Sequence, residues 1–135
     1  MPGSAAPRNI LIVDDERSVA DTLALILSTR NHTIQVAYSA EAGIEIIAEW
    51  APDLAIVDVM LPLMNGIDFS IVMKDNYPSC HVLLFSGQPD TSALLEEALK
   101  KGHCFDVLAK PQHPTFILDA VENLLARVQA SQADS

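Results

Sequence analysis

The sequence is poor in cysteine and in positive charge, and it contains no long hydrophobic run. Two cysteines are too few for the disulfide framework of a small secreted domain. Eight basic residues against 18 acidic ones give a net charge of −10, so we expect no direct binding to nucleic acid. No apolar run approaches the ~18 residues of a membrane-spanning helix, which predicts no membrane insertion.

The N-terminal segment also lacks the hydrophobic core of a signal peptide. Half of the 135 residues are hydrophobic, and a chain of this size buries roughly two-thirds of its unfolded surface. We therefore expect one soluble, cytoplasmic domain over residues 8–128. Flexible tails are predicted over residues 1–7 and 129–135, which lack a continued apolar stripe.

Short apolar segments alternate with segments of helical periodicity along the whole chain. The pattern predicts strands over residues 8–14, 33–37, 53–58, 81–86 and 104–109. It predicts helices over residues 16–30, 39–50, 66–76, 90–101 and from 114 onward. Near-continuous apolar strands joined by helices are typical of a parallel sheet covered on both faces, and right-handed crossovers then predict a doubly wound α/β sandwich.

The second helix is expected to start at a Ser39 cap and to turn Ile44, Ile47 and Ala48 inward. Gly102 is expected to close the fourth helix.

Side chains that can take part in chemistry stand at the carboxyl ends of four of the five predicted strands. In strand order, these side chains are Asp14 and Asp15, Asp58, Ser86 and Lys110. Each alone has an ordinary explanation, as a helix-cap acid, a turn residue, a loop hydroxyl or a solvated lysine. Parallel strands, however, bring their carboxyl ends to one edge of the sheet. Two carboxylates about 4 Å apart repel by roughly 4 kcal/mol at an effective dielectric of ~20, so the cluster predicts a divalent cation such as Mg²⁺.

This set of groups suits phosphoryl transfer. A carboxylate can attack phosphorus to form an acyl phosphate, while a metal ion, Lys110 and the Ser86 hydroxyl neutralise the phosphoryl oxygens.

Five segments carry a resemblance to a known family, and they are ILIVDDE (10–16), PDLAIVDVMLPLMNG (52–66), LLFSG (83–87), Gly102 and LAKP (108–111). These segments occur in this order and at the ends of predicted elements. Together they make the sequence resemble the receiver domain of two-component response regulators of the chemotaxis-regulator type. The resemblance implies a flavodoxin-like doubly wound sheet of five parallel strands in the order 2-1-3-4-5, with five helices.

The resemblance also implies roles for individual residues. Asp58 would be the phosphoacceptor and would share a Mg²⁺ or Mn²⁺ ion with Asp15, with Asp14 through water, and with the backbone carbonyl of Met60. Lys110 would contact the phosphoryl group.

The same resemblance implies a switch region. Ser86 would move toward the phosphoryl group, and the Lys110–Pro111 peptide would be cis. The family commonly has Tyr or Phe at position 107 and often Phe at position 112, but this chain has Val107 and Gln112. Valine has no large ring to rotate. We therefore hypothesise that the phosphoryl chemistry is kept, but that partners read the signal by a mechanism other than rotation of an aromatic side chain.

The expected partners are a sensor histidine kinase or a histidine phosphotransfer protein, and an output protein that the sequence does not identify. The domain would accept a phosphoryl group and lose it again without being a turnover enzyme. Two alternatives stay open. One is a phosphorylation-independent binding module, and the other is a hydrolase of the aspartyl-phosphate type, which generally has an acid where this chain has Met60.

Cys80 and Cys104 each precede a strand-end site residue by six positions, and His81 and His103 stand beside them. Zinc binding or a redox pair would use such residues. Buried reduced thiols are the interpretation that the cytoplasmic setting favours.

Overall fold

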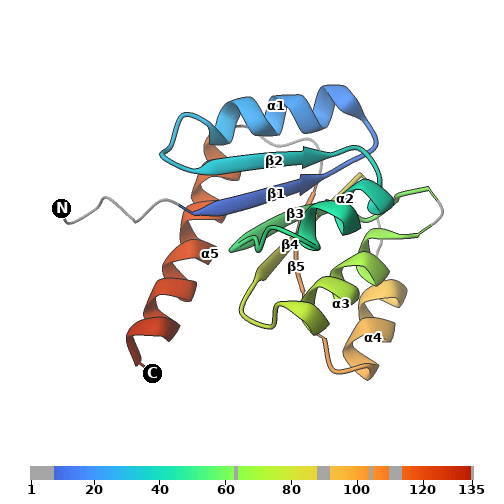
Figure 1. Cartoon of the computed structure of the whole chain (residues 1–135). Coiled ribbons are helices and arrows are strands. Elements are labelled where there is room, and N and C mark those ends of the chain that lie inside the picture. The colour runs from blue at the N-terminus through green and yellow to red at the C-terminus, as the bar shows by residue number, and fades with distance from the viewer. Residues whose placement is uncertain (1–7, 63, 88–91, 104, 110–113, 135) are drawn as a thin grey trace.

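The computed structural model describes residues 8–62, 64–87, 92–103, 105–109 and 114–134. Five strands alternate with five helices, as Figure 1 shows. The strands are β1 (Asn9–Val13), β2 (Thr33–Ala37), β3 (Leu54–Asp58), β4 (His81–Ser86) and β5 (Asp106–Ala109). The helices are α1 (Arg17–Leu27), α2 (Ala40–Ile47), α3 (Gly66–Asn76), α4 (Ser92–Lys100) and α5 (Pro114–Asp134).

All five strands are parallel and lie in the order β2-β1-β3-β4-β5. This confirms the predicted fold class and strand order. The two edge strands are β2 and β5, and the three strands inside the sheet, β1, β3 and β4, are buried almost throughout. No helix within the described part of the chain is long and apolar enough to cross a membrane.

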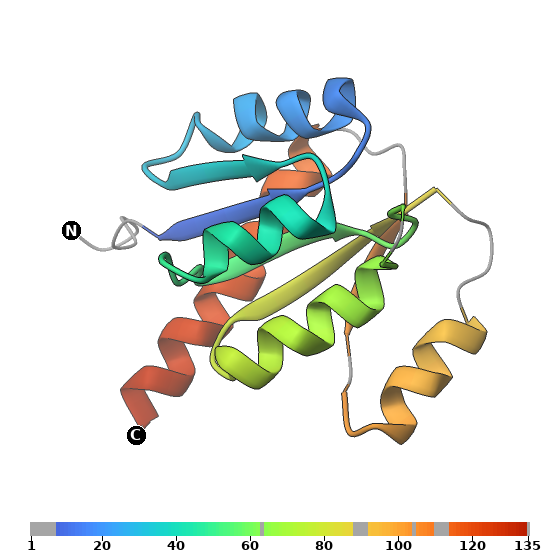
Figure 2. The ribbon, with the colours of Figure 1, turned by 45° about the vertical axis from the view of Figure 1, so that its right-hand side comes forward.

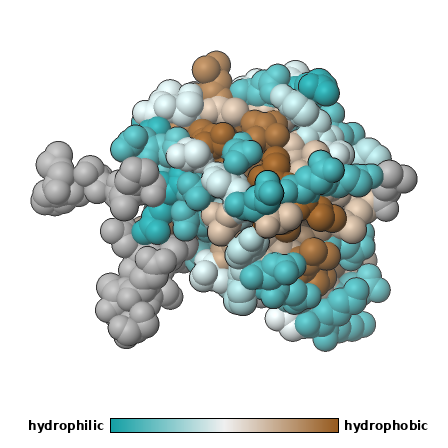
Figure 3. Space-filling view, in the orientation of Figure 1, coloured by the Kyte–Doolittle hydropathy of each residue, from teal (hydrophilic) through white to brown (hydrophobic). Residues whose placement is uncertain are grey.

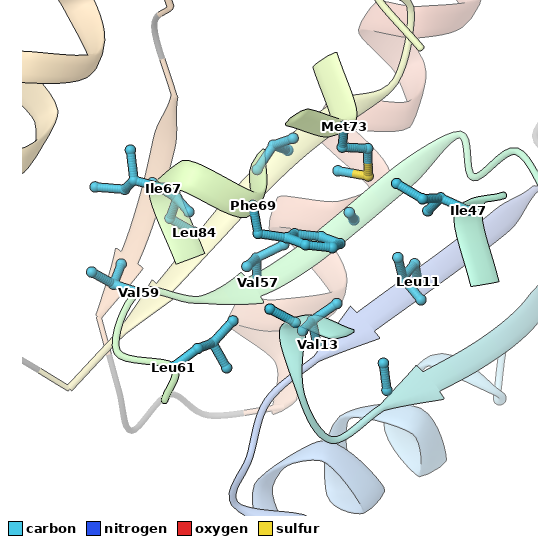
Figure 4. Close-up of a cluster of buried hydrophobic side chains, with 14 of the residues drawn as sticks. Leu11, Val13, Ile47, Val57, Val59, Leu61, Ile67, Phe69, Met73 and Leu84 are labelled. Carbon is cyan, nitrogen blue, oxygen red and sulfur yellow. The ribbon is translucent and has the colours of Figure 1, made fainter. Parts of the chain in front are cut away.

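Alternating side chains of the central strands divide the core into two halves. Leu11 and Val13 of β1 face the layer of α2, α3 and α4, whereas Ile10 and Ile12 face α1 and α5. Figure 2 shows α2 and α3 in front of the sheet and α5 behind it. The first half of the core centres on Phe69 of α3, whose ring lies among strand and helix side chains in Figure 4.

Most element boundaries agree with the predictions, but four features differ, one of which is that α2 ends at Ile47 and not at residue 50. The fifth strand begins at Asp106 rather than 104, because the chain is still closing α4, where Gly102 has a φ of +88° and the His103 amide donates to the Ala98 carbonyl. The first helix ends at Leu27 rather than near residue 30. The last helix continues to Asp134, past the apolar stripe that predicted an end near 128, through residues of good helix propensity.

The inward face of α2 was predicted incorrectly in part. Ile47 is buried as expected, but Ile44 is 37% exposed and Ala48 is also exposed. Gly43 faces inward instead, because its missing side chain leaves room for the Phe69 ring. A Cβ atom at Gly43 would lie 2.9 Å from two carbons of that ring. The predicted Ser39 cap is confirmed, since its hydroxyl accepts a hydrogen bond from the Ala42 amide at 3.1 Å.

Candidate functional site

Two buried carboxyl groups lie at the carboxyl ends of neighbouring strands. Asp14 follows β1 directly and is 1% exposed, while Asp58 is the last residue of β3 and is 5% exposed. Val13 pairs with Val57 in the sheet, so the two acids leave adjacent strands at the same level. Burial of two carboxyl groups side by side is costly unless their charges are compensated.

Backbone hydrogen bonds orient both acids. The Asp14 amide donates to the Ala37 carbonyl at 3.1 Å, which ties the end of β1 to the end of β2. The Asp14 side chain accepts from the Glu16 amide at 2.9 Å, a local turn of the kind that aspartate forms two residues ahead. The Asp58 side chain accepts from the Met60 amide at 3.2 Å. Each carboxylate is therefore held by the chain that follows it.

A third acid joins these two, and it is Glu16 rather than Asp15. One carboxylate oxygen from each of Asp14, Glu16 and Asp58 lies within 4.8 Å of the others. Asp15 is exposed and is not a member of this group. Sequence reasoning missed Glu16, although the Asp-x-Glu turn that folds it back toward the strand end could have indicated it.

The donor set of this acid cluster (Asp14, Glu16 and Asp58) fits a hard divalent cation. Opposite ligands of an octahedral Mg²⁺ lie roughly 4.2 Å apart, twice the metal–oxygen bond length of ~2.1 Å. The three carboxylate oxygens lie within 4.8 Å of one another, so rotation of the side chains could bring them onto one such ion. Carboxylates are also the ligand type that Mg²⁺ prefers over softer groups.

Gly66 holds the backbone of the acid cluster close to α3. Its amide donates to the Val59 carbonyl at 2.8 Å, just after Asp58. A Cβ atom added at Gly66 would lie 1.9 Å from the Asp58 carbonyl oxygen, so no other residue fits there without movement. The glycine that ends the segment PDLAIVDVMLPLMNG (52–66) thus has a steric role, because the start of α3 rests directly on Asp58, the residue that ends β3.

Ser86 ends the next strand and is 2% exposed. Asp58 pairs with Phe85, and the Val59 amide donates to the Phe85 carbonyl at 3.2 Å, so Ser86 stands beside the chain that leaves Asp58. Met60 is 52% exposed at the mouth of the site.

The remaining predicted site residues are on β5 or follow it in the sequence. Ala109 pairs with Ser86 and ends β5, one residue before Lys110. Lys110 and the predicted cis-proline, Pro111, lie outside the described residues, as does Gln112. Val107 is on β5, 38% exposed.

Of the two cysteines noted in the sequence, Cys104 lies outside the described residues. Cys80 is free and 1% exposed. His103 stacks on Phe105 and has its Nε2 atom 3.9 Å from Asp75. Among the described residues the acid cluster is the only group of three or more acidic, His or Cys residues close enough to hold a metal ion.

Burial raises the pKa of the Cys80 thiol to about 12. The folded protein therefore keeps a proton that the unfolded chain loses near pH 8.5. We expect the free energy of unfolding to fall as the pH rises above ~8.5, by at most about 1.4 kcal/mol per pH unit from this group. Urea unfolding between pH 8 and ~10 should show a shallower decline in Cys80→Ala. Identical slopes in the two proteins would contradict a buried, protonated thiol.

The fold is a doubly wound α/β domain, and the acid cluster lies at the edge of the sheet where the strands have their C-terminal ends. Residues 10–122 match the family model of the response regulator receiver domain, and the chain belongs to this family. Such domains are signalling switches, generally phosphorylated on an aspartate, and they bind Mg²⁺ through acidic residues. Response regulators receive their phosphoryl group from histidine kinases.

Named relatives agree with this assignment. The regulatory protein VanR of Enterococcus faecium is 34% identical over 120 residues, covering 87% of this chain and 50% of VanR. The response regulator MprA of Mycobacterium ulcerans is 31% identical over 121 residues, covering 90% of this chain and 48% of MprA. The chain spans about half the length of these curated relatives.

Solved structures show the same fold. A CheY-like receiver domain protein from Methanospirillum hungatei has a TM-score of 0.84 at 21% identity, covering 93% of this chain and 99% of that one. The signal receiver domain of an HD domain-containing protein from Pseudomonas fluorescens also has a TM-score of 0.84, at 27% identity with the same coverage.

Proposed function

We propose that residues 8–128 form a receiver domain that acts in the cytoplasm and accepts a phosphoryl group on Asp58 from a sensor histidine kinase or a histidine phosphotransfer protein. The observation that carries this proposal is the buried Asp58 carboxylate, 5% exposed, in one cluster with the carboxylates of Asp14 and Glu16. An ionised carboxylate is itself the nucleophile, so the step needs no separate general base.

The residues of the chain have distinct parts in this step. The Met60 amide bonds one Asp58 oxygen at 3.2 Å, which orients the carboxylate toward an incoming phosphorus. The Asp15 carboxylate, the Asp14 carboxylate through water and the Met60 carbonyl would hold Mg²⁺ or Mn²⁺ together with Asp58, while the clustered Glu16 would add negative charge beside the ion. The bound ion would neutralise phosphoryl oxygens. Ser86 and Lys110 would contact the transferred group, and its later hydrolysis would reset the switch.

The exposed Asp15 and the clustered Glu16 make a matched pair for testing the metal site. We expect Asp15→Asn to weaken Mg²⁺ binding about tenfold, as loss of a direct ligand would, and Glu16→Gln to weaken it several-fold through lost attraction. Isothermal titration with magnesium chloride measures both. Glu96→Gln, a change of an exposed acid on α4, is the control and should bind as the wild type does. A larger loss in Glu16→Gln would assign the direct ligand to Glu16 instead.

Incubation with acetyl phosphate and Mg²⁺ tests the function itself. Mass spectrometry should find one added phosphoryl group, mapped to the peptide that contains Asp58. A binding module that works without phosphorylation would show no adduct. A hydrolase would release phosphate over many turnovers, which the apolar Met60 in the acid/base position disfavours.

Signal readout is expected to differ from rotation of an aromatic side chain, because position 107 of β5 holds valine. We propose that Ser86 shifts toward the phosphoryl group while Val107 stays in place. Crystal structures with and without beryllofluoride, a phosphoryl mimic, measure this. A displacement of Val107 as large as that of a rotating ring would refute the idea.

A further inference from the structure

Helix α2 carries a line of three exposed acids. Glu41, Glu45 and Glu49 follow one another at intervals of four residues. Glu49 continues the last turn beyond Ile47, since its amide donates to the Ile46 carbonyl at 3.1 Å. Residues four apart lie on one side of a helix, so the three carboxylates form a single ridge, here called the glutamate ridge.

The glutamate ridge is unfavourable for the isolated helix. Like charges four residues apart repel one another, and Glu49 stands at the C-terminal end, where the helix dipole disfavours a negative charge. The last turn of α2 contains no basic residue. None of the ion pairs found among the described residues involves the ridge. Glu41 stands in the first turn, where a negative charge suits the helix dipole, but the rest of the ridge opposes the stability of α2.

Two open hollows with mixed polar and apolar linings flank the glutamate ridge. Toward the β2 edge, a hollow of 470 Å³ is lined by Ile46, Trp50, Ala42 and Gln35, with Glu45 and Glu49 at its wall. Toward α3, a hollow of 280 Å³ is lined by Ile44, Ile47, Ala48, Val72, Asn76 and Tyr77. Figure 3 shows a broken band of apolar side chains among hydrophilic ones on the face of the molecule that carries α2.

We propose that the glutamate ridge and its two hollows bind a cationic amphipathic helix of a partner protein. Successive side chains four residues apart on a helix rise about 6 Å, so lysines or arginines at that interval match the spacing of the three glutamates. Apolar side chains beside those cations would enter the hollows, as ridges enter grooves in helix packing. The surface needs no phosphoryl chemistry, so its test is independent of the function proposed for Asp58.

Charge selects this occupant over other candidates. A second copy of the chain, with a net charge of −10, would bring two glutamate ridges together. An anionic membrane surface would also be repelled. A cationic helix instead relieves the repulsion along the ridge and covers the apolar side chains in the two hollows, such as Ile46 and Ile44, at the same time.

The test uses the full chain and a synthetic amphipathic helix of leucine and lysine, about 18 residues long so that it is helical. Trp50 is the only tryptophan and lines the larger hollow, so its emission reports binding at this place. We expect saturable binding with a shift of the emission to shorter wavelength. A peptide with glutamate in place of lysine should not bind.

Two triple variants with equal net charge locate the surface. Glu41→Gln, Glu45→Gln and Glu49→Gln together should raise the Kd about tenfold. The control neutralises three exposed acids of α4 and α5, as Glu96→Gln, Glu97→Gln and Asp119→Asn, and should raise it at most about threefold by lowering the net charge. Equal weakening by both triples, an unchanged Trp50 emission or absence of binding would overturn the proposal.

Discussion

Asp58→Asn is expected to abolish phosphoryl incorporation and, without divalent cations, to raise the free energy of unfolding. The amide cannot attack phosphorus, so mass spectrometry after acetyl phosphate treatment should find no adduct. Asparagine keeps the oxygen that accepts the Met60 amide bond at 3.2 Å, so the local backbone stays supported. The substitution therefore removes one negative charge from the acid cluster and keeps this hydrogen bond.

The rise in stability follows from repulsion within the cluster. Carboxylate oxygens within 4.8 Å of one another repel by a few kcal/mol per pair at an effective dielectric of ~20, before partners and solvent reduce it. After that reduction we expect a gain on the order of 1 kcal/mol in urea unfolding with a metal chelator present. Addition of Mg²⁺ should stabilise the wild type and should stabilise Asp58→Asn much less.

Asp53→Asn is the matched control. It makes the same substitution at the other end of β3, since Asp53 directly precedes this strand and Asp58 ends it. The Asp53 carboxylate accepts the Asn9 amide at 2.8 Å and lies 4.0 Å from Arg8. Its charge is thus compensated, and we expect this variant to lose stability and to keep the adduct. The result that would count against the acid cluster is a loss of stability in Asp58→Asn similar to that in Asp53→Asn.

The part of the site that the sequence predicts well is the part that depends on topology. Parallel strands must end at one edge, so Asp14 and Asp58 could be brought together from strand patterns alone. Glu16 could not be placed in this way, because its position depends on a local turn in which its own amide bonds the Asp14 side chain. A turn of that kind decides whether Asp15 or Glu16 faces the cluster, and strand periodicity carries no information about it.

The errors in α2 have a related cause. The helix has apolar residues on more than one side, so periodicity alone offers several inward faces. The actual face is decided by Phe69 of α3, whose ring packs against Gly43 and leaves Ile44 toward the surface. Such a choice rests on contacts between helices far apart in sequence. The fold class survives this error because strand order depends on the sheet and not on the rotation of one helix.

Residue patterns also do not reveal where two backbone segments come close together, as Gly66 of α3 and Asp58 of β3 do. The substitution Gly66→Ala tests this contact. The added methyl group would lie 1.9 Å from the Asp58 carbonyl oxygen, which cannot rotate away as a side chain would. We expect a loss of at least about 3 kcal/mol in urea unfolding, although alanine favours a helix by roughly 1 kcal/mol. Because Asp58 must shift, adduct formation should slow on the order of 100-fold.

Two other glycines separate this clash from general effects of adding a methyl group. Gly43→Ala meets the Phe69 ring at 2.9 Å, a side-chain contact, and should cost about 1–3 kcal/mol with adduct formation retained. Gly102→Ala meets nothing within 4 Å and should cost only about 1–2 kcal/mol for its φ of +88°. If Gly66→Ala unfolded at the same urea concentration as Gly102→Ala and still formed the adduct at the wild-type rate, the contact between α3 and Asp58 would not position the phosphoacceptor.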